Sequence, residues 1–517
     1  MSTHPVALQD VAIALPAEPA ARVHPEGTVL IVGAGLGGLS AAIHLRLAGW
    51  DVTMLEAQPT VGGRANLLAR DGFRFDVGPS LLNYPWVFEE LFAAAGRRLR
   101  DYVRLVPVEP SVSFRWPDDT SLTLSSDLRR LLDEFDRVEP GTRGSALAYM
   151  QDAAEKYRIA FDGLVTGNQT SYLAWLRSVG LRNVPRLSLW RSMDAQLRRY
   201  FPGGRIADAL GSYAMYLGGA PRDLPGFFAM LPYGELAYGL WLPEGGIYGL
   251  VTAVQRLATE LGVRIRTQCP VRRIRVEQGQ VRGVQLDTGE EIDSRIVVSN
   301  VDVPTTERSL LPPQESARRA PVMTPGVITF YWGVRGTLDP LGHHTIFLPG
   351  DVRATYEDLM RRGRMPRELA FYISVPSATD PSLAPRDHSA VFGLVPVPLL
   401  DDVTDAAWPA IAAQTRTAVF DRLRRHGVAL TPDRICVEEC WTPQEWRRRF
   451  GLYRGAAFGA AHTLGQLGPW RSRNYHPTVA GLFYAGASTT PGTGLPMVVL
   501  GGRMVADRVR DRIGVPA

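Results

Sequence analysis

The chain has 517 residues, of which 45% are hydrophobic and 21% charged. This length predicts about three domains of roughly 150 residues each, and the composition excludes intrinsic disorder. The formal net charge is only +5, and without a dense basic block or recognition motif we expect no nucleic-acid partner. Three cysteines, Cys269, Cys436 and Cys440, are too few for a disulfide framework and fit a reducing compartment.

Two segments could act as targeting or membrane signals. Residues 1–26 have no basic region followed by an apolar core, so we expect a flexible N-terminal tail rather than a signal peptide. The uncharged stretch 477–502 is interrupted by prolines and glycines. Because these residues break a spanning helix, we expect no transmembrane segment there.

The front of the chain carries a dinucleotide-binding pattern. A buried strand is predicted over 28–32, a helix from Leu39 to about residue 49, and a second strand over 51–55. Between the first strand and the helix stands Gly33-Ala34-Gly35-Leu36-Gly37-Gly38. Such glycines permit the tight turn, the approach of the backbone to a pyrophosphate and the close packing of helix on strand.

Glu56 directly follows the second predicted strand. A carboxylate at this place accepts hydrogen bonds from ribose hydroxyls, and it disfavours a 2′-phosphate. The pattern therefore favours NAD or FAD over NADP, and the alternative is a βαβ unit without a ligand.

The next motifs distinguish between these two cofactors. Val61-Gly62-Gly63-Arg64 comes directly after the second strand, and Asp76-Val77-Gly78-Pro79 follows. Here the sequence resembles flavoproteins of the amine oxidase and phytoene desaturase type. The resemblance implies FAD, with Glu56-Ala57 at the nucleotide, Gly62, Gly63 and Arg64 along the flavin and pyrophosphate, and Gly78-Pro79 near the ring. For Arg64 the alternative is a surface ion pair.

The middle of the chain is predicted to return to the nucleotide domain. A helix is expected over 250–261 after Gly245-Gly246, and strands over 263–267, 271–276, 281–286 and 296–300. In the resembled group the backbone near Val271 meets the adenine. From the residues alone, an ordinary structural βαβ unit is favoured slightly.

The C-terminal segment adds a third part of the cofactor site. A strand ending at Gly486 precedes a glycine-rich stretch that includes Met497 and leads into an apolar helix up to about Val509. The free N–H groups and the positive end of such a helix suit a pyrophosphate and the flavin edge. We therefore predict an α/β protein with a discontinuous Rossmann-like FAD-binding domain, over 27–115, 241–300 and 441–517. An α+β substrate and membrane-associating domain is predicted over 116–240 and 301–440.

Motifs between these segments narrow the resemblance to bacterial carotenoid desaturases of the phytoene desaturase family, and the similarity extends from about Gly27 to Arg510. The motifs lie at 343–348, 376–385, 394–398, 455–459 and 471–474. One departure is Thr490, where family members usually carry a histidine, which puts an acid/base role for that position in doubt. We expect no metal at His343-His344, because neighbouring residues on a strand point to opposite faces and no carboxylate cluster completes a site.

The stretch 187–241 is rich in aromatic residues with interleaved arginines. Its residues alone favour a plain hydrophobic core, whereas the family resemblance favours a long apolar pocket and a surface that meets lipid headgroups. Carrying a carotenoid of about forty carbons through water would cost on the order of tens of kcal/mol. We therefore expect peripheral attachment to the cytoplasmic side of the cell membrane.

The resemblance implies desaturation of an acyclic carotenoid by hydride transfer to flavin, with quinone or oxygen as the electron acceptor. Two substrates remain open: phytoene in successive steps, or a hydroxylated carotenoid in a late 3,4-type step. The only lysine, Lys156, lies outside the cofactor motifs, which argues against amine oxidation, and the sequence identifies no catalytic base. The alternatives are a non-redox carotenoid cis–trans isomerase and, more remotely, a cofactor-free prenyl- or lipid-binding carrier.

Overall fold

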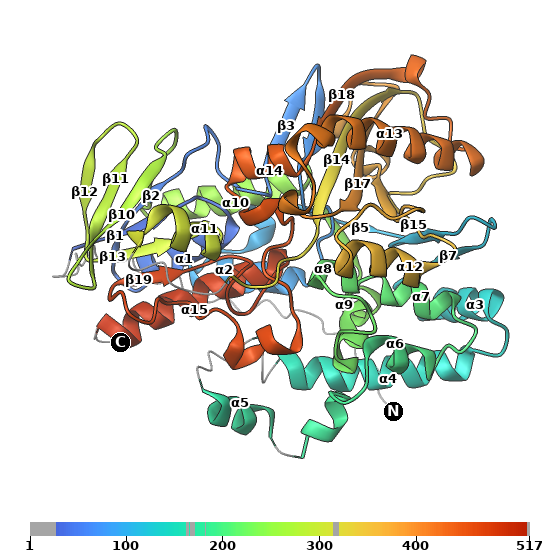
Figure 1. Ribbon diagram of the computed structural model, residues 1–517, viewed down its shortest axis with the longest axis horizontal. Helices are drawn as coiled ribbons and strands as arrows, with labels where there is room; N and C mark the ends of the chain where they lie inside the picture. The colour runs from blue at the N-terminus through green and yellow to red at the C-terminus, as the bar shows by residue number, and fades with distance from the viewer. Residues whose placement is uncertain (1–26, 162–164, 166–170, 181, 314–319, 514–517) are drawn as a thin grey trace.

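Two β-sheets and a group of helices organise the chain (Figure 1). The computed structural model describes residues 27–161, 165, 171–180, 182–313 and 320–513. The tail predicted over 1–26 lies outside the described residues. In Figure 1 the parallel sheet lies at one side, the largest sheet at the other, and helices α3, α4, α6 and α7 below the latter.

The first sheet is fully parallel, with the strand order β19-β13-β1-β2-β9. Its strands are β1 (Thr28–Val32), β2 (Asp51–Leu55), β9 (Arg264–Arg266), β13 (Ile296–Ser299) and β19 (Leu482–Tyr484). Segments far apart in the sequence thus share one sheet, which confirms the predicted Rossmann-like architecture.

Three helices cover this sheet: α1 (Leu36–Leu47), α10 (Ile247–Glu260) and α15 (Leu495–Ile513). Helix α1 begins at Leu36, one turn before the predicted start at Leu39. Helices α1 and α15 pack closely, because Gly502 leaves room for Ser40, whose hydroxyl donates to the Val499 carbonyl at 2.7 Å. None of the described helices is long and apolar enough to cross a bilayer.

A separate antiparallel sheet is formed by β10 (Val271–Glu277), β11 (Gln280–Leu286) and β12 (Glu291–Asp293). The strands predicted over 271–276 and 281–286 are therefore present but leave the parallel sheet, whereas the strand predicted over 263–267 joins it as β9. Strand β12 was not predicted.

The largest sheet has the order β18-β14-β17-β16-β15-β6-β7. Its strands are β6 (Ser113–Arg115), β7 (Ser121–Thr123), β14 (Gly326–Arg335), β15 (His344–Phe347), β16 (Phe371–Ser374), β17 (His388–Val397) and β18 (Ile435–Trp441). Alternate residues of β14 serve two cores. Phe330 and Trp332 pack in the cluster that contains Trp408 of α13 (Trp408–Arg425), whereas Tyr331 belongs to the main core on the opposite face.

The predicted domain limits stay a prediction. Two strands of the largest sheet lie at predicted limits. They are β6, which ends the first predicted cofactor segment, and β18, whose last residue begins the third. Two short antiparallel strand pairs lie outside these sheets: β3 (Leu67–Arg70) with β4 (Phe73–Asp76), and β5 (Leu105–Val108) with β8 (Leu240–Pro243).

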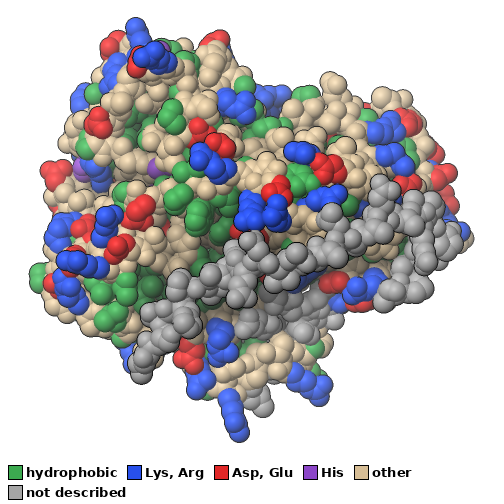
Figure 2. Space-filling model, turned by 180° about the vertical axis from the view of Figure 1, so that it is seen from behind, with side chains coloured by type: hydrophobic (Ala, Val, Ile, Leu, Met, Phe, Trp, Pro, Cys, Tyr) green, Lys and Arg blue, Asp and Glu red, His purple; other side chains and the backbone are tan. Residues whose placement is uncertain are grey.

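The helical group consists of α3 (Leu128–Val138), α4 (Arg143–Ala160), α5 (Tyr172–Val179), α6 (Met193–Arg198), α7 (Arg205–Gly211), α8 (Ala214–Leu217) and α9 (Leu231–Tyr238). Further helices are α2 (Pro85–Ala94), α11 (Val303–Thr305), α12 (Val352–Tyr356) and α14 (Pro443–Phe450). On the face shown in Figure 2, basic and acidic side chains are interspersed, as the small net charge leads one to expect.

Candidate functional site

The candidate site lies at the carboxyl edge of the parallel sheet. Gly33 follows β1, Glu56 follows β2 and Asn300 follows β13, while Gly486 comes shortly after β19. In open α/β sheets, ligands bind in the crevice outside the carboxyl ends of the strands. The topology therefore brings the predicted glycines and acid to one edge.

The glycine loop has room for a ligand because side chains are absent. A Cβ on Gly35 would lie 2.8 Å from the Asn300 Oδ1 atom, and one on Gly38 would lie 2.6 Å from the Gly33 carbonyl oxygen. Helix α1 begins directly after Gly35, without a side-chain cap and without an acidic residue in its first turn. Its first N–H groups and its positive end are thus available to phosphates.

Glu56 ties this loop to the second strand. Its carboxylate accepts hydrogen bonds from the Ala34 N–H at 2.6 Å and from the Gln58 N–H at 2.9 Å. Burial raises the pKa of Glu56, and the backbone donors oppose that rise. Each carboxylate oxygen keeps a lone pair for a ribose hydroxyl.

The segment around Val271 runs beside Glu56. The Cys269 N–H donates to the Glu56 carbonyl at 2.8 Å, and the Gln268 N–H donates to the Gln58 carbonyl at 3.1 Å. These bonds place Pro270 and Val271 in the lining of the cavity that also contains Glu56 and Ala57. The sheet of β10 to β12 is thereby joined to the nucleotide side of the site.

The Gly-Gly-Arg segment packs on the glycine loop. The Gly62 N–H donates to the Ala34 carbonyl at 2.8 Å, and a Cβ on Gly63 would lie 3.4 Å from the Gly35 Cα atom. Gly78 in turn packs on the backbone of Arg64, because its Cβ would lie 2.6 Å from the Arg64 carbonyl oxygen. Backbone approach therefore requires glycine at Gly62, whose Cβ would lie 2.7 Å from the Ala65 carbonyl oxygen, and at Gly78, whereas at Gly63 the φ of +57° favours glycine.

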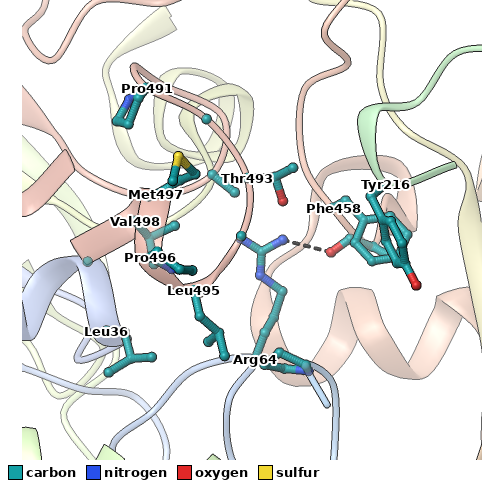
Figure 3. A pocket seen from close by; sticks show the side chains of 18 of the residues that line it. Leu36, Arg64, Tyr216, Phe458, Pro491, Thr493, Leu495, Pro496, Met497 and Val498 are labelled. Atoms are coloured by element: carbon teal, nitrogen blue, oxygen red, sulfur yellow. Dashed lines mark hydrogen bonds between the residues drawn. The ribbon is translucent and has the colours of Figure 1, made fainter. Parts of the chain in front are cut away.

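Arg64 and Asp302 are half-buried members of a polar network in the cavity lining, and Arg64 is not part of a surface ion pair. Its Nη1 atom donates to the Ala457 carbonyl at 2.7 Å (Figure 3). Burial lowers the pKa of Arg64, and the charge of Asp302 opposes this. Asp302 accepts from the Ser488 hydroxyl, and Arg471 donates to the carbonyls of its neighbours, including that of Ala487 at 2.6 Å.

One cavity of about 960 Å³ contains all the predicted cofactor residues except Ala34 and Gly38, which support its wall from behind. In Figure 3 the lining runs from Leu36 past Arg64 to Tyr216 and Phe458, with Met497 at the start of α15. Beyond Arg64 it is predominantly apolar and aromatic. This part includes Tyr84, Tyr157, Phe161, Leu187, Tyr213, Tyr216, Phe227, Phe228, Leu394 and Phe458.

The cavity fits FAD on observations of three kinds. A Cβ at Gly35 or Gly38 would clash with neighbouring atoms of the loop, helices α1 and α15 direct their N-terminal ends at the cavity without acidic first turns, and Glu56 offers acceptors beside Val271. Arg64 offsets negative charge between the two halves. These residues would hold the nucleotide, with the flavin adjoining the apolar half.

Sequence reasoning missed several residues of this site. Asn300 and Asp302 follow β13, and Glu235 lies on α9 with its side chain buried in the apolar half. An Asn-x-Asp pair at the carboxyl end of a predicted buried parallel strand was the signal for the first two. Nothing local marked Glu235, because its partners Ser111 and Tyr213 are distant in sequence.

Some expectations need correction. The rings of His343 and His344 lie with their centroids 4.0 Å apart, so the two side chains do not point to opposite faces. The reason is that β15 begins only at His344. In the described part of the chain no group of three metal-ligating side chains occurs. Asp76 accepts from the N–H groups of Ile247 and Tyr248 and so caps α10.

The aromatic residues of the stretch 187–241 serve both predicted roles, the hydrophobic core and the apolar pocket. Tyr213, Tyr216, Phe227 and Phe228 line the cavity, whereas Phe201 packs in the core against the rings of Tyr149 and Phe135. Lys156 is buried, pairs with Asp152 and is not among the residues that line the cavity. It has a structural role in α4.

Comparison with known proteins agrees with this geometry. A model of flavin-containing amine oxidoreductases matches residues 36–510. The chain is 36% identical over 485 residues to the zeta-carotene-forming phytoene desaturase of Myxococcus xanthus, covering 93% of each protein. It is 34% identical to the carotenoid 3,4-desaturase of Haloarcula japonica, covering 94% of this chain and 98% of that protein.

Solved structures agree on the fold. An oxidoreductase from Methanosarcina mazei superposes with a TM-score of 0.59 at 17% identity, over 93% of this chain and all of that one. Putrescine oxidase bound to putrescine gives 0.58 at 17% identity, over 94% and 99% of the two chains. The chain belongs to the flavin-containing amine oxidoreductases, in the branch of the carotenoid desaturases, and its cofactor is FAD.

Proposed function

We propose that the protein is an FAD-dependent desaturase of an acyclic carotenoid that works at a membrane surface. The observation that carries this proposal is the continuity of the cavity. One space joins the N–H-rich glycine loop to an aromatic half, and this half reaches the exposed side chains of Trp190, Leu464 and Trp470.

The apolar half suits a long hydrocarbon. At about 25 cal/mol per Å² of apolar surface removed from water, a polyene gains most of its binding free energy from such walls. The rings around Tyr216 and Phe458, whose centroids lie 5.5 Å apart in an edge-to-face pair, restrict the path of a rod-shaped molecule. FAD, when bound, supplies the oxidising group that accepts a hydride, and the chain's own residues align the substrate and exclude water.

The relatives named phytoene desaturase and carotenoid 3,4-desaturase support this assignment. The test is expression in cells that accumulate phytoene and in cells that accumulate hydroxylated lycopene derivatives. Desaturation shifts the absorbance of the extract to longer wavelength and removes two hydrogens per new double bond. A product of unchanged mass would instead indicate an isomerase. A product that gains oxygen would indicate chemistry like that of the 4,4′-diapolycopene oxygenase of Methylomonas, which is 32% identical to this chain.

The membrane contact is proposed to be the mouth of the cavity. Trp190, Leu464 and Trp470 line the cavity, yet their exposed fractions are 77%, 56% and 59%. Leu173 of α5, a helix that packs against the segment ending at Trp470, is exposed as well. Figure 2 shows basic side chains along the lower edge of the molecule, where α5 lies in Figure 1. Exposed tryptophans with nearby arginines suit an interface with anionic lipids.

Sedimentation with anionic lipid vesicles tests this contact. We expect the double variant W190S/W470S to lose most of its vesicle binding while it retains FAD. The matched control is L128S, because Leu128 is 48% exposed on α3 and does not line the cavity. Equal sedimentation of the double variant and the wild type would disprove the assignment of the mouth.

A surface-bound enzyme can pass its electrons to a membrane quinone, and oxygen is the other acceptor that we propose. Anaerobic vesicles with and without quinone distinguish them. Turnover that continues anaerobically only with quinone supports the quinone, and turnover that requires air supports oxygen.

A further inference from the structure

The apolar half of the cavity contains a buried polar group that a pure hydrocarbon substrate does not need. We name it the Glu235 cluster, consisting of Ser111, Tyr213 and Glu235. The Ser111 hydroxyl donates to the Glu235 Oε1 atom at 2.5 Å, and the Tyr213 hydroxyl donates to Oε2. Glu235 is 2% exposed and lines the cavity together with Tyr213.

Among the described residues, no lysine or arginine forms an ion pair with the Glu235 carboxylate. Burial raises the pKa of Glu235 to about 7, the two hydroxyl donors oppose the rise, and the charge of Glu109 adds to it. The hydroxyl groups of the nearby Tyr84, Tyr216 and Tyr372 are uncharged, and burial raises the pKa of each further above its ordinary value. The cluster is therefore a neutral or singly charged set of donors and acceptors within hydrocarbon walls.

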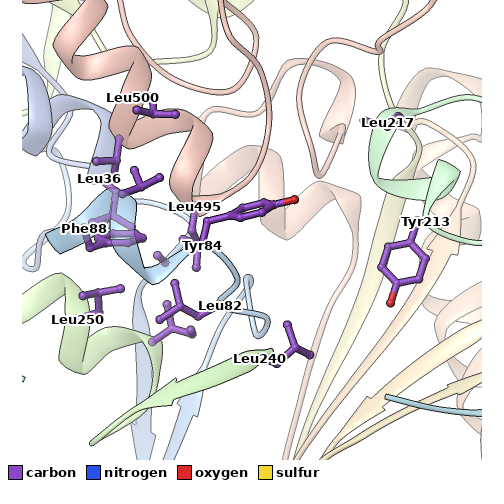
Figure 4. Close-up of a cluster of buried hydrophobic side chains, with 14 of the residues drawn as sticks. Leu36, Leu82, Tyr84, Phe88, Tyr213, Leu217, Leu240, Leu250, Leu495 and Leu500 are labelled. Carbon is purple, nitrogen blue, oxygen red and sulfur yellow. The ribbon is translucent and has the colours of Figure 1, made fainter. Parts of the chain in front are cut away.

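The position of the cluster separates it from the nucleotide. In Figure 4 Leu36, which begins the helix of the glycine loop, and Tyr213 on the segment leading into α8 lie at opposite sides of the view. Glu56, Asp302 and Glu235 are the carboxylates among the described residues that line the cavity. The first two are engaged by the glycine loop and by the Arg64 network, which leaves Glu235 for the apolar half.

We propose that the Glu235 cluster binds a hydroxyl group on the substrate, so that the preferred carotenoid carries a hydroxylated end. This inference rests on the proposed function. Each oxygen of Glu235 accepts one hydrogen bond from the chain and keeps a lone pair, and the Tyr213 oxygen can accept as well. A substrate hydroxyl can therefore donate to the carboxylate or accept from the protonated acid. A hydrocarbon end leaves these groups without a further partner, and a site built for a hydroxyl discriminates strongly against such an analogue.

Binding measurements test the proposal without turnover. The purified protein, with its bound FAD reduced beforehand so that it cannot accept a hydride, is titrated with lycopene and with 1-hydroxylycopene in detergent micelles under anaerobic conditions. The readout is the quenching of tryptophan fluorescence, to which Trp190, Trp446 and Trp470 of the cavity lining contribute. We expect the wild type to bind the hydroxylated compound at least tenfold more tightly.

Variants assign this preference to the cluster. In the double variant Y213F/E235L we expect the preference to fall to about one, through weaker binding of 1-hydroxylycopene and unchanged or tighter binding of lycopene. The control Y157F removes a cavity-lining hydroxyl outside the cluster and should keep the wild-type preference. Retention of FAD shows that each variant is folded, and if the double variant does not fold, Y213F alone should lose part of the preference.

Two results would overturn the inference: equal affinities in the wild type, or an unchanged preference in both Y213F/E235L and Y213F. Failure of the proposed function is a separate result. A protein that prefers 1-hydroxylycopene but desaturates neither compound contradicts the proposed function alone. One that desaturates lycopene and binds both equally contradicts the hydroxyl site alone.

Discussion

Replacing Glu56 with alanine tests the nucleotide end of the site. In the structure the Glu56 carboxylate accepts from the Ala34 and Gln58 N–H groups at 2.6 and 2.9 Å. Ala34 is fully buried, so its N–H cannot turn to water after the substitution, whereas Gln58 is partly exposed. A hydrogen bond to a charged group contributes about 1.5–3 kcal/mol.

Because E56A also removes the acceptor for a ribose hydroxyl, the loss of one such bond should weaken FAD binding about 10- to 150-fold. The conservative variant E56Q keeps one acceptor and should lie between E56A and the wild type. The assay is the FAD content after gel filtration, followed by titration of the apoprotein with FAD. As the control, E290A removes an exposed glutamate that pairs with Arg266 and should retain FAD. Wild-type affinity in a folded E56A protein would refute the role given to this carboxylate.

Two further predictions concern stability. Gly38→Ala should lower the free energy of unfolding by about 1–3 kcal/mol, because its Cβ would meet the Gly33 carbonyl oxygen, a backbone atom that cannot rotate away. By contrast, a Cβ on Gly144 in α4 would meet nothing within 4 Å, so Gly144→Ala should be neutral or stabilising by up to about 1 kcal/mol. Urea unfolding of both variants measures this difference. Equal destabilisation of the two variants would contradict it. Glu235→Gln should gain stability relative to the wild type as pH rises from about 4.5 to about 7. The folded wild type holds its proton through this window while the unfolded chain releases it, so the wild type loses roughly 3 kcal/mol. A pH-independent difference between E235Q and the wild type would show that Glu235 ionises at its ordinary pKa.

Local patterns made the front of the chain predictable. Strand β1, the glycine loop and Glu56 all lie in the single short stretch from Thr28 to Glu56, so periodicity and turn chemistry fix their arrangement almost without tertiary information. The largest sheet is different. Strand β15 pairs in parallel with β6, although the whole helical group and the second cofactor segment separate the two strands in sequence. No short-range rule specifies such a register, because it depends on which faces the whole chain can bury.

The same distinction explains the errors within the site. Arg64 was predicted at the cofactor from a local motif, and the structure places it in the cavity lining. Its balance with Asp302 depends on a residue that is remote in sequence and follows a different strand of the sheet. The orientation of His343 and His344 was wrong because the alternation rule holds inside a strand, and β15 begins between them. Chemistry set by neighbours in sequence was predictable, and chemistry set by the meeting of distant segments was not.

The two carboxylates Glu56 and Glu235 show how one cavity can treat two ligands differently. Burial raises the pKa of both. The partners of Glu56 are backbone N–H groups, which only donate, so this carboxylate is held as an acceptor and suits the hydroxyl donors of a ribose. The partners of Glu235 are hydroxyls, which rotate and can donate or accept, so either protonation state is accommodated. Substitutions at Ser111 or Tyr213 should therefore change the choice of substrate and leave FAD binding intact, since none of the bonds that hold the glycine loop passes through them.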